Sequence, residues 1–264
     1  MLVGFLGAGH IARALAEGWR RPELPAADHP GLLVFDPAGE RVASFADSFD
    51  ALVCGSIAEL VAGSELVILA MRPPDVPAAL REVAPALGGR PVVSLAAFVP
   101  LGELRTGLPA DAHVSRVMPN VAAAVGRGVF LFVPGSVAEA EARATRRLFG
   151  LSGIVVDVAE EQFDEATAIS GCGPGFAALF VAALVEAGVQ AGLAPDLAVD
   201  LAAGAVAGSG ELIARDRDPD ALLKAIATPG GMTAAGLDVL EDRGLRAIVA
   251  AAVAASIEKV KKGR

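Results

Sequence analysis

The first 160 residues of the chain alternate short apolar runs with amphipathic segments. Seven of the apolar runs read as β-strands: 2–6, 32–36, 66–70, 91–95, 113–118, 128–133 and 154–158. Strands that are apolar on both faces are typical of a parallel sheet covered by helices on its two sides. An amphipathic helix is expected from about His10 to Arg20, ending before Pro22. This pattern predicts an α/β domain.

The pattern changes after about residue 160. Strand-like runs stop, and Ala- and Leu-rich helical periodicity continues to the end, interrupted by the Gly- and Pro-containing segments 192–195 and 229–231. We therefore predict two domains, an α/β domain over 1–160 and an all-helical domain over 161–264.

Composition limits the binding partners. Hydrophobic residues make up 54% of the chain and the mean hydropathy is +0.55, which indicates dense helix packing and buried subunit contacts. The net charge of −9 argues against a nucleic acid or an anionic membrane surface as partner. The uncharged stretch between Glu165 and Glu186 contains the glycine-rich residues 171–175, which would break a membrane-spanning helix, so no membrane span is expected. The two cysteines imply no disulfide framework, and a cytoplasmic protein is expected.

A glycine motif follows the first strand. Gly7 and Gly9 stand between this strand and the first helix, where a pyrophosphate can bind to exposed N–H groups and to the positive end of the helix dipole. The third small residue of the motif is Ala12. The arrangement predicts a Rossmann-type dinucleotide-binding domain, with His10 and Ile11 at the helix start among the coenzyme-binding residues.

Asp36 ends the second strand. Its carboxylate is expected to accept hydrogen bonds from the adenosine ribose and to repel a 2′-phosphate, which favours NAD. The alternative is a turn residue before Pro37, where Asp is common. Arg41 is a candidate contact for a phosphate, so the sequence leaves both NADH and NADPH open.

The chain is poor in groups that donate protons to a substrate. It contains no tyrosine, three of its four lysines lie within residues 259–262, and its three histidines show no partner pattern. No metal-ligand spacing is visible. A ketone that is reduced to an alkoxide needs a proton donor, whereas an iminium ion is already protonated. This composition favours the reduction of a C=N bond.

Two further motifs lie in the helical half, at residues 164–176 and 227–233. Each directly precedes a helix. The second offers consecutive N–H groups at a helix N-terminus, a nest suited to a carboxylate, and Thr233 adds a hydroxyl beside it. The alternative interpretation is a Pro-Gly turn with an ordinary Thr cap.

Together these motifs resemble those of the pyrroline-5-carboxylate reductase family, and the resemblance covers essentially the whole chain. The segments that carry it, in order, are 4–9 (GFLGAG), 70–73 (AMRP), 94–97 (SLAA), 116–120 (RVMPN), 170–174 (SGCGP) and 228–233 (TPGGMT). The resemblance implies reduction of 1-pyrroline-5-carboxylate to L-proline with NADPH or NADH. It also implies a helical dimerisation domain interleaved with that of a second subunit, active sites at the dimer interface, and assembly of dimers into a ring.

The resemblance also assigns site residues. Gly231, Met232 and Thr233 would hold the substrate carboxylate through N–H groups, aided by the Thr228 hydroxyl, and Thr233 would act catalytically by bonding the imine nitrogen. Asn120 would shape the loop beside the transferred hydride as part of the substrate site. The expected coenzyme-binding residues are Gly7, Gly9, His10, Ile11, Asp36, Ala70, Arg72, Pro73, Ala96 and Ala97.

The chain departs from the family pattern near the expected site. The departures are Phe98 for a glycine, Val121 and Ala122 for Thr-Pro, Arg127 for Glu, Phe176 for Tyr, and Met232 for a small residue. They leave two alternatives open: a related reductase of a different cyclic imine, and a non-catalytic dinucleotide-binding homologue. A β-hydroxyacid dehydrogenase is less favoured, because no lysine lies at the start of the helical half.

Overall fold

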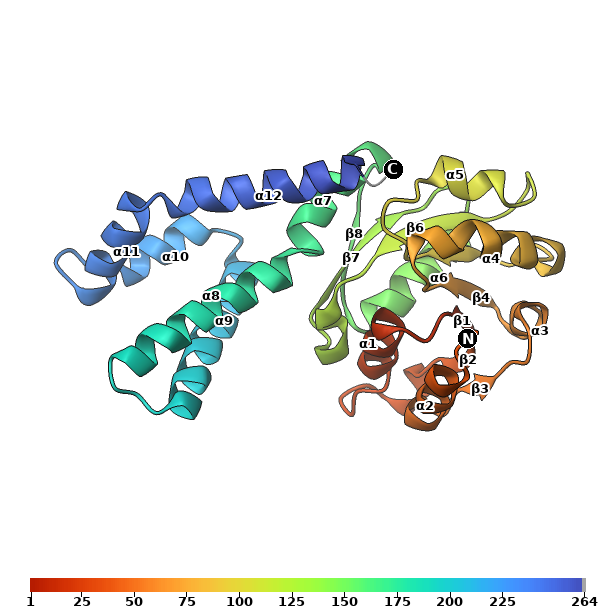
Figure 1. Ribbon diagram of the computed structural model, residues 1–264, viewed down its shortest axis with the longest axis horizontal. Helices are drawn as coiled ribbons and strands as arrows, with labels where there is room; N and C mark the ends of the chain where they lie inside the picture. The colour runs from red at the N-terminus through yellow and green to blue at the C-terminus, as the bar shows by residue number, and fades with distance from the viewer. Residues whose placement is uncertain (263–264) are drawn as a thin grey trace. The chain divides into compact units, whose positions relative to one another are not determined.

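A computed structural model describes residues 1–262 of the chain. The chain divides into two compact units (Figure 1). The first comprises Met1–Gly171 together with the last helix from Ile257 onward, and the second comprises Cys172–Ser256. The first unit is the α/β part and the second is helical, but the first unit runs past the expected boundary at residue 160 to Gly171 and also takes in the end of the last helix.

The first unit is built on an eight-stranded sheet with the order β3-β2-β1-β4-β5-β6-β7-β8. The strands are β1 (Leu2–Leu6), β2 (Gly31–Phe35), β3 (Leu52–Val53), β4 (Leu66–Leu69), β5 (Val92–Ser94), β6 (Val114–Met118), β7 (Gly128–Val133) and β8 (Gly153–Asp157). The seven predicted strands are all present. The sequence pattern missed β3, which is two residues long and exposed.

All neighbouring strands pair in parallel except β6 and β7, which are antiparallel. Only a short 3₁₀ segment, η4 (Val121–Val125), connects these two strands. A parallel pair needs a longer crossover connection, so this short link reverses the chain direction. The predicted Rossmann-type sheet is confirmed, with this one reversed pairing.

Helices cover both faces of the sheet (Figure 1). Their bounds are α1 (His10–Trp19), α2 (Gly39–Phe49), α3 (Ile57–Gly63), α4 (Val76–Val83), α5 (Leu101–Thr106), α6 (Glu139–Gly150) and α7 (Phe163–Ser170), with short 3₁₀ segments η1 (Ala26–Asp28), η2 (Pro73–Asp75), η3 (Ala84–Ala86) and η5 (Glu160–Gln162). Buried side chains of α1, α2 and α6 form one core with the sheet, and those of α3, α4, α5 and α7 form the other. The first core is rich in aromatic residues. The rings of Trp19 and Phe149 pack edge to face there, with 5.9 Å between the ring centroids.

An ion pair between the buried Arg116 and the half-buried Glu160 joins β6 to the segment before α7. The Nη1 atom of Arg116 lies 2.7 Å from Oε1 of Glu160, and its guanidinium stacks 3.8 Å above the ring of Phe163. The same Glu160 oxygen accepts the N–H of Leu101 at the start of α5. One carboxylate thus connects three elements at the β6 side of the sheet.

The second unit consists of α8 (Gly173–Gln190), α9 (Pro195–Asp216), α10 (Pro219–Ile226), α11 (Met232–Asp242) and α12 (Leu245–Lys262), whose last described turns belong to the first unit. In those turns Val260 is buried, and Lys261 lies 4.0 Å from Glu165 of α7. The last helix therefore contributes to both units.

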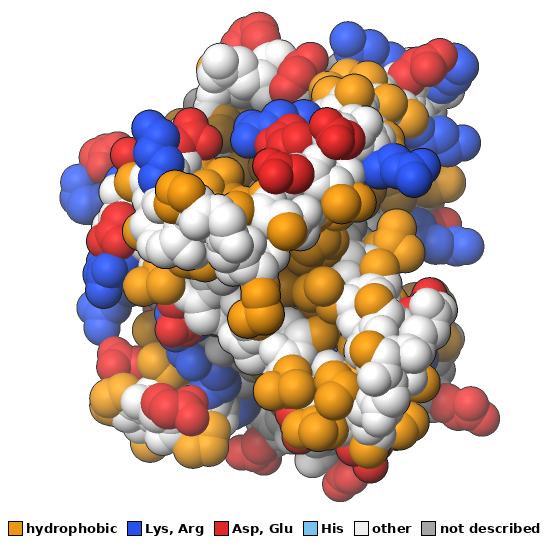
Figure 2. All heavy atoms as spheres, turned by 90° about the vertical axis from the view of Figure 1, so that its left-hand side faces the viewer, with side chains coloured by type: hydrophobic (Ala, Val, Ile, Leu, Met, Phe, Trp, Pro, Cys, Tyr) orange, Lys and Arg blue, Asp and Glu red, His pale blue; other side chains and the backbone are white. Residues whose placement is uncertain are grey.

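The helices of the second unit expose much apolar surface. No residue of α8 is buried, and Leu179 is 72% exposed. Figure 2 shows hydrophobic side chains on the surface of these helices. Two segments, Glu160–Gln190 and Pro195–Asp216, are long and apolar enough to cross a membrane by length and composition. A surface of this kind needs a covering partner.

Candidate functional site

A cleft of about 850 Å³ opens at the carboxyl ends of β1, β2 and β4. In an open parallel sheet this edge is where ligands bind, and the strand order reverses between β1 and β4, which makes it the natural position for a dinucleotide. Seven of the ten expected coenzyme-binding residues line it: Gly7, Gly9, His10, Ile11, Asp36, Ala70 and Arg72. These seven residues come from three separate segments of the chain, 7–11, 36 and 70–72.

Gly7 and Gly9 suit their positions for different structural reasons. Gly7 has φ +106°, and a Cβ at this position would lie 2.7 Å from the carbonyl oxygen of Ala70, so only glycine fits the turn. Gly9 precedes the first residue of α1, and a Cβ there would meet no atom within 4 Å. The space beside Gly9 is therefore open, and the first N–H groups of α1 have no acceptor within the helix. These features fit the pyrophosphate of a dinucleotide.

Asp36 is almost entirely buried where the cleft meets the end of β2, and its carboxylate has three partners. Oδ2 accepts the N–H of Ala8 at 3.0 Å, inside the glycine turn, and Oδ1 accepts the N–H of Ala38 at 2.9 Å. Arg41 lies 3.1 Å from Oδ1. The bond to Ala38 corresponds to the alternative considered from the sequence, in which Asp36 is a turn residue. The bond to Ala8 fixes the glycine turn to the end of β2.

A smaller hollow of about 360 Å³ adjoins the helix start, lined by Gly9, Arg13, Glu40 and Arg41 among others. Arg13 donates to the hydroxyls of Ser44 and Ser48 at 3.4 and 3.0 Å, so α2 holds its guanidinium in place. Two guanidinium groups beside a helix N-terminus make this hollow suited to an anion. Sequence reasoning missed Arg13, because its importance depends on α2 lying next to α1.

The remaining expected coenzyme residues lie outside the lining of the cleft. Pro73 opens η2, directly after the lining residue Arg72, which is paired with Asp75 at 3.1 Å. Ala96 and Ala97 follow β5, the strand beyond β4, and Leu69 of β4 is in register with Ser94 of β5. Lining residues that were not among the expected site residues are Leu6, Phe35, Pro37, Ile57, Met71, Asp75, Ala79 and Glu82. Apart from their closeness in sequence to predicted residues, nothing distinguished them.

Asn120 is buried, and both ends of its amide are bonded. Nδ2 donates to the carbonyl of Ser170 at the end of α7, at 2.9 Å, and Oδ1 accepts the N–H of Val129 at 3.3 Å. The side chain therefore ties the loop after β6 to the glycine-rich segment that begins at Gly171. In the structure, the bonds of this predicted substrate residue hold two backbone segments in position.

The Thr228–Thr233 segment lies in the helical unit and begins α11. Gly230 has φ +74°, and a Cβ on Gly231 would lie 2.6 Å from the Thr228 hydroxyl, so the turn requires small residues. The Gly231 N–H donates to the Thr228 carbonyl at 2.9 Å. The N–H groups of Met232 and Thr233, in the first turn of the helix, have no acceptor within it. They form the part of the expected nest that is open to an anion, and both side chains are exposed.

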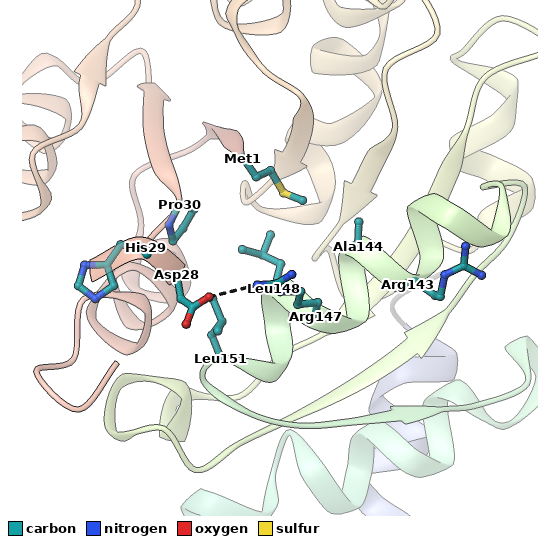
Figure 3. A pocket seen from close by; sticks show the side chains of 10 residues that line it. Met1, Asp28, His29, Pro30, Arg143, Ala144, Arg147, Leu148 and Leu151 are labelled. Atoms are coloured by element: carbon teal, nitrogen blue, oxygen red, sulfur yellow. Dashed lines mark hydrogen bonds and ion pairs between the residues drawn. The ribbon is translucent and has the colours of Figure 1, made fainter. Parts of the chain in front are cut away.

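Figure 3 shows a third pocket, of about 420 Å³, at the opposite edge of the sheet. Its lining includes Met1 and Pro30, which directly precede β1 and β2, and residues of α6. An ion pair between Asp28 and Arg147, at 3.1 Å, lies within it, and His29 points away from that pair. The pocket contains none of the expected site residues. Over residues 1–262, no group of three or more His, Cys, Asp or Glu side chains is placed to hold a metal ion.

Comparisons with known proteins agree with this arrangement. The family described as pyrroline-5-carboxylate reductase dimerisation matches residues 160–263, and the family described as NADP oxidoreductase, coenzyme F420-dependent, matches residues 2–98. Pyrroline-5-carboxylate reductase 3 of Bos taurus is 36% identical over 257 residues, which cover 96% of this chain and 82% of the relative. The pyrroline-5-carboxylate reductase of Pseudomonas aeruginosa is 31% identical, covering 97% of this chain and 94% of its own.

Solved structures give the same result. The Plasmodium falciparum pyrroline carboxylate reductase, solved with NADP bound, superposes with a TM-score of 0.87 at 29% identity, covering 99% of this chain and 97% of the other. The Streptococcus pyogenes 1-pyrroline-5-carboxylate reductase superposes with a TM-score of 0.86, also at 29% identity, and covers 99% and 98% of the two chains.

Proposed function

Because this chain belongs to the pyrroline-5-carboxylate reductase family, we propose that it reduces 1-pyrroline-5-carboxylate to L-proline as an NAD(P)H-dependent oxidoreductase. The observation that carries the proposal is the similarity to named reductases over nearly the whole chain, joined to a cleft of dinucleotide type at the strand ends. The bound coenzyme, NADH or NADPH, supplies a hydride to the C=N carbon of the substrate.

Residues of the first unit bind and orient the coenzyme. The turn at Gly7 and the N–H groups at the start of α1 hold the pyrophosphate, while Asp36 keeps the turn in its binding conformation through Ala8. Arg13 and Arg41 add positive charge beside this position. Ala70, Pro73, Ala96 and Ala97 border the ribose and nicotinamide half, along the ends of β4 and β5.

Residues of the second unit bind the substrate. The Met232 and Thr233 N–H groups and the Thr228 hydroxyl hold the carboxylate, and the Thr233 hydroxyl bonds the imine nitrogen. The protonated imine needs no further proton donor, so these groups act by orienting the substrate. Asn120 contributes by fixing the loop after β6 to the segment at Ser170.

The exposed helices support a homo-oligomer. We propose a homodimer in which the helical units interleave and cover each other's apolar faces, with dimers assembled further into a ring. This places the apolar helices α8 and α9 against a second copy of the chain and not in a membrane. A cytoplasmic enzyme that stays in the supernatant after ultracentrifugation without detergent is expected.

A substrate panel tests the proposal. Steady-state rates are measured with 1-pyrroline-5-carboxylate, its six-membered homologue and a cyclic imine that lacks the carboxylate, each with NADH and with NADPH. We expect the five-membered imino acid to be reduced fastest and the imine without a carboxylate to be poor, because the nest then has no anion to hold. Coenzyme binding is measured separately by fluorescence.

Val121 and Met232, which depart from the family pattern, are 61% and 95% exposed. The same experiment therefore also tests the two alternatives, a reductase of a different cyclic imine and a non-catalytic homologue. Faster turnover of a different imine would replace the proposed substrate and keep the reaction type. Coenzyme binding without turnover of any imine would show a non-catalytic homologue and would refute the proposed activity.

A further inference from the structure

The cleft at the strand ends also contains a group of lining residues that no motif of the sequence marked. They are Phe35 at the end of β2, Ile57 at the start of α3, and Ala79 and Glu82 of α4. All four belong to the first unit, so the structure places them relative to the glycine turn. Phe35 and Ile57 are half-buried and Ala79 is buried, and together they form an apolar slot within the cleft.

Glu82 adds a carboxylate to this slot. Asp75, Ala79 and Glu82 are spaced four and three residues apart, so α4 presents all three side chains to the cleft on one face. The Asp75 carboxylate is paired with Arg72 at 3.1 Å. Within residues 1–262, the exposed side chain of Glu82 has neither an ion pair nor a hydrogen bond. Its carboxylate is therefore free to bind a ligand that enters the slot.

The path of a bound dinucleotide leads to this slot. With the pyrophosphate at the turn of Gly7 and the start of α1, the adenosine ribose lies at the end of β2 beside Asp36. The adenine ring is the next group along the molecule. Phe35 directly precedes Asp36, and Ile57 and Ala79 line the same cleft, so apolar walls are present where the flat ring extends from the ribose.

An unpaired carboxylate is unfavourable beside an anionic coenzyme. It repels the phosphates, so it weakens coenzyme binding unless it meets a hydrogen-bond donor. Adenine offers such a donor in its N6 amino group, whereas guanine carries an oxygen acceptor at the same position. The carboxylate of Glu82 and the amino group of adenine are therefore chemically complementary.

We propose that Glu82 is a specificity-determining residue that accepts a hydrogen bond from the N6 amino group of the coenzyme's adenine. The proposal rests on the coenzyme binding of the proposed function and deepens it, independently of which imine is reduced. Phe35, Ile57 and Ala79 hold the ring, and Glu82 selects the base by its amino group. Because Glu82 is exposed and water competes for its carboxylate, the amino group contributes about three- to tenfold to the affinity.

Two coenzymes that differ only in this amino group test the proposal. Dissociation constants are measured by fluorescence for the tighter-binding of NADH and NADPH, and for its analogue in which unsubstituted purine replaces adenine. We expect the wild type to bind the adenine coenzyme about three- to tenfold more tightly than the analogue. Glu82→Ala should bring the ratio of the two dissociation constants close to one. Glu82→Gln keeps a neutral acceptor and should retain part of the preference.

Glu103→Ala is the matched control, because Glu103 is an exposed carboxylate of α5 that does not line the cleft. This variant should keep the wild-type ratio. The proposal is overturned if Glu82→Ala also keeps that ratio, including the case in which both coenzymes bind more tightly because the carboxylate only repels phosphates. Loss of the preference in Glu103→Ala would overturn it as well.

The proposal and the proposed function can fail separately. If the wild type reduces 1-pyrroline-5-carboxylate but binds both coenzymes equally, the proposed function stands and the role of Glu82 is refuted. If the wild type prefers the adenine coenzyme and loses this preference in Glu82→Ala but reduces no imine, the proposed activity is refuted and the role of Glu82 stands.

Discussion

The carboxylate of Asp36 holds N–H groups of two turns and one guanidinium, and these contacts have separate consequences. Asp36→Ala leaves the buried Ala8 N–H without its acceptor, which costs about 1–3 kcal/mol. We expect the free energy of unfolding in urea to fall by this amount. The affinities for NADH and NADPH should both decrease, because the glycine turn is no longer held.

Arg41→Ala is the control, because the guanidinium is 58% exposed and its loss leaves both backbone bonds to Asp36 in place. Stability should change little. A variant of Asp36 that binds NADPH more tightly than the wild type, with unchanged stability, would contradict the anchoring role and support direct repulsion of a 2′-phosphate.

Thr233 is the residue for which a hydroxyl is proposed to touch the substrate. Thr233→Val keeps the side-chain shape and removes a hydrogen bond to a charged group, which is worth about 1.5–3 kcal/mol. We expect kcat/KM for 1-pyrroline-5-carboxylate to fall about ten- to hundredfold. Thr233→Ser should keep most of the activity, and equal losses in both variants would refute a role for the hydroxyl.

Cys54 follows β3 and is buried. Burial raises the pKa of its thiol, and the nearby Glu59 carboxylate raises it further. Because the folded state favours the protonated thiol, this contribution to stability is present at neutral pH. It is lost as the pH rises from about 8, the region of the ordinary thiol pKa, through the higher folded value.

Urea unfolding as a function of pH measures this effect. The wild type should lose stability relative to Cys54→Ala as the pH rises through that range, with Cys172→Ala following the wild type. Parallel pH profiles for the wild type and Cys54→Ala would contradict the shifted thiol.

At the scale of elements, the Arg116–Glu160 pair holds β6, α5 and the segment before α7 together. Removing one partner of a buried pair costs about 3–5 kcal/mol, whereas replacing both by apolar residues is often nearly neutral. Because the Glu160 side chain is 28% exposed and water can reach it after the substitution, we expect Arg116→Leu alone to lower the free energy of unfolding by less than this, about 1–3 kcal/mol. The double variant Arg116→Leu/Glu160→Leu should recover part of the lost free energy of unfolding. If the losses of the two single variants simply add in the double variant, the two side chains act independently.

The elements show which parts of the fold the sequence determines locally. Seven strands were predicted because each has an apolar run, but an apolar run reads the same in either direction. The antiparallel pairing of β7 therefore depends on the short η4 link and was not predicted. The residues Gly7 and Gly9 followed from a local motif, whereas Arg13 depends on the neighbouring helix α2. Phe98 was marked by its departure from the family pattern, but its left-handed backbone is visible only in the structure.

At the scale of the whole molecule, the exposed helix α8 predicts self-association. Leu179→Asp places a charge at a side chain that is 72% exposed within its own chain, so the fold of each unit should be retained. Light scattering should give a mass that is a multiple of 26.6 kDa for the wild type and a single chain for the variant. Glu186→Gln on the same helix is the control, and a variant that keeps the wild-type mass would exclude α8 from the interface.

The return of α12 to the first unit has a consequence for biosynthesis. Ile257 and the residues after it complete a unit whose other residues end at Gly171, so all of the helical unit is synthesised in between. Domains generally fold as units while the chain emerges from the ribosome. Here the nucleotide-binding unit is completed only after the helical unit has emerged. Until then, the surface of the first unit that covers Val260 remains exposed. The first unit is therefore the first to be translated and the last to be completed in this protein.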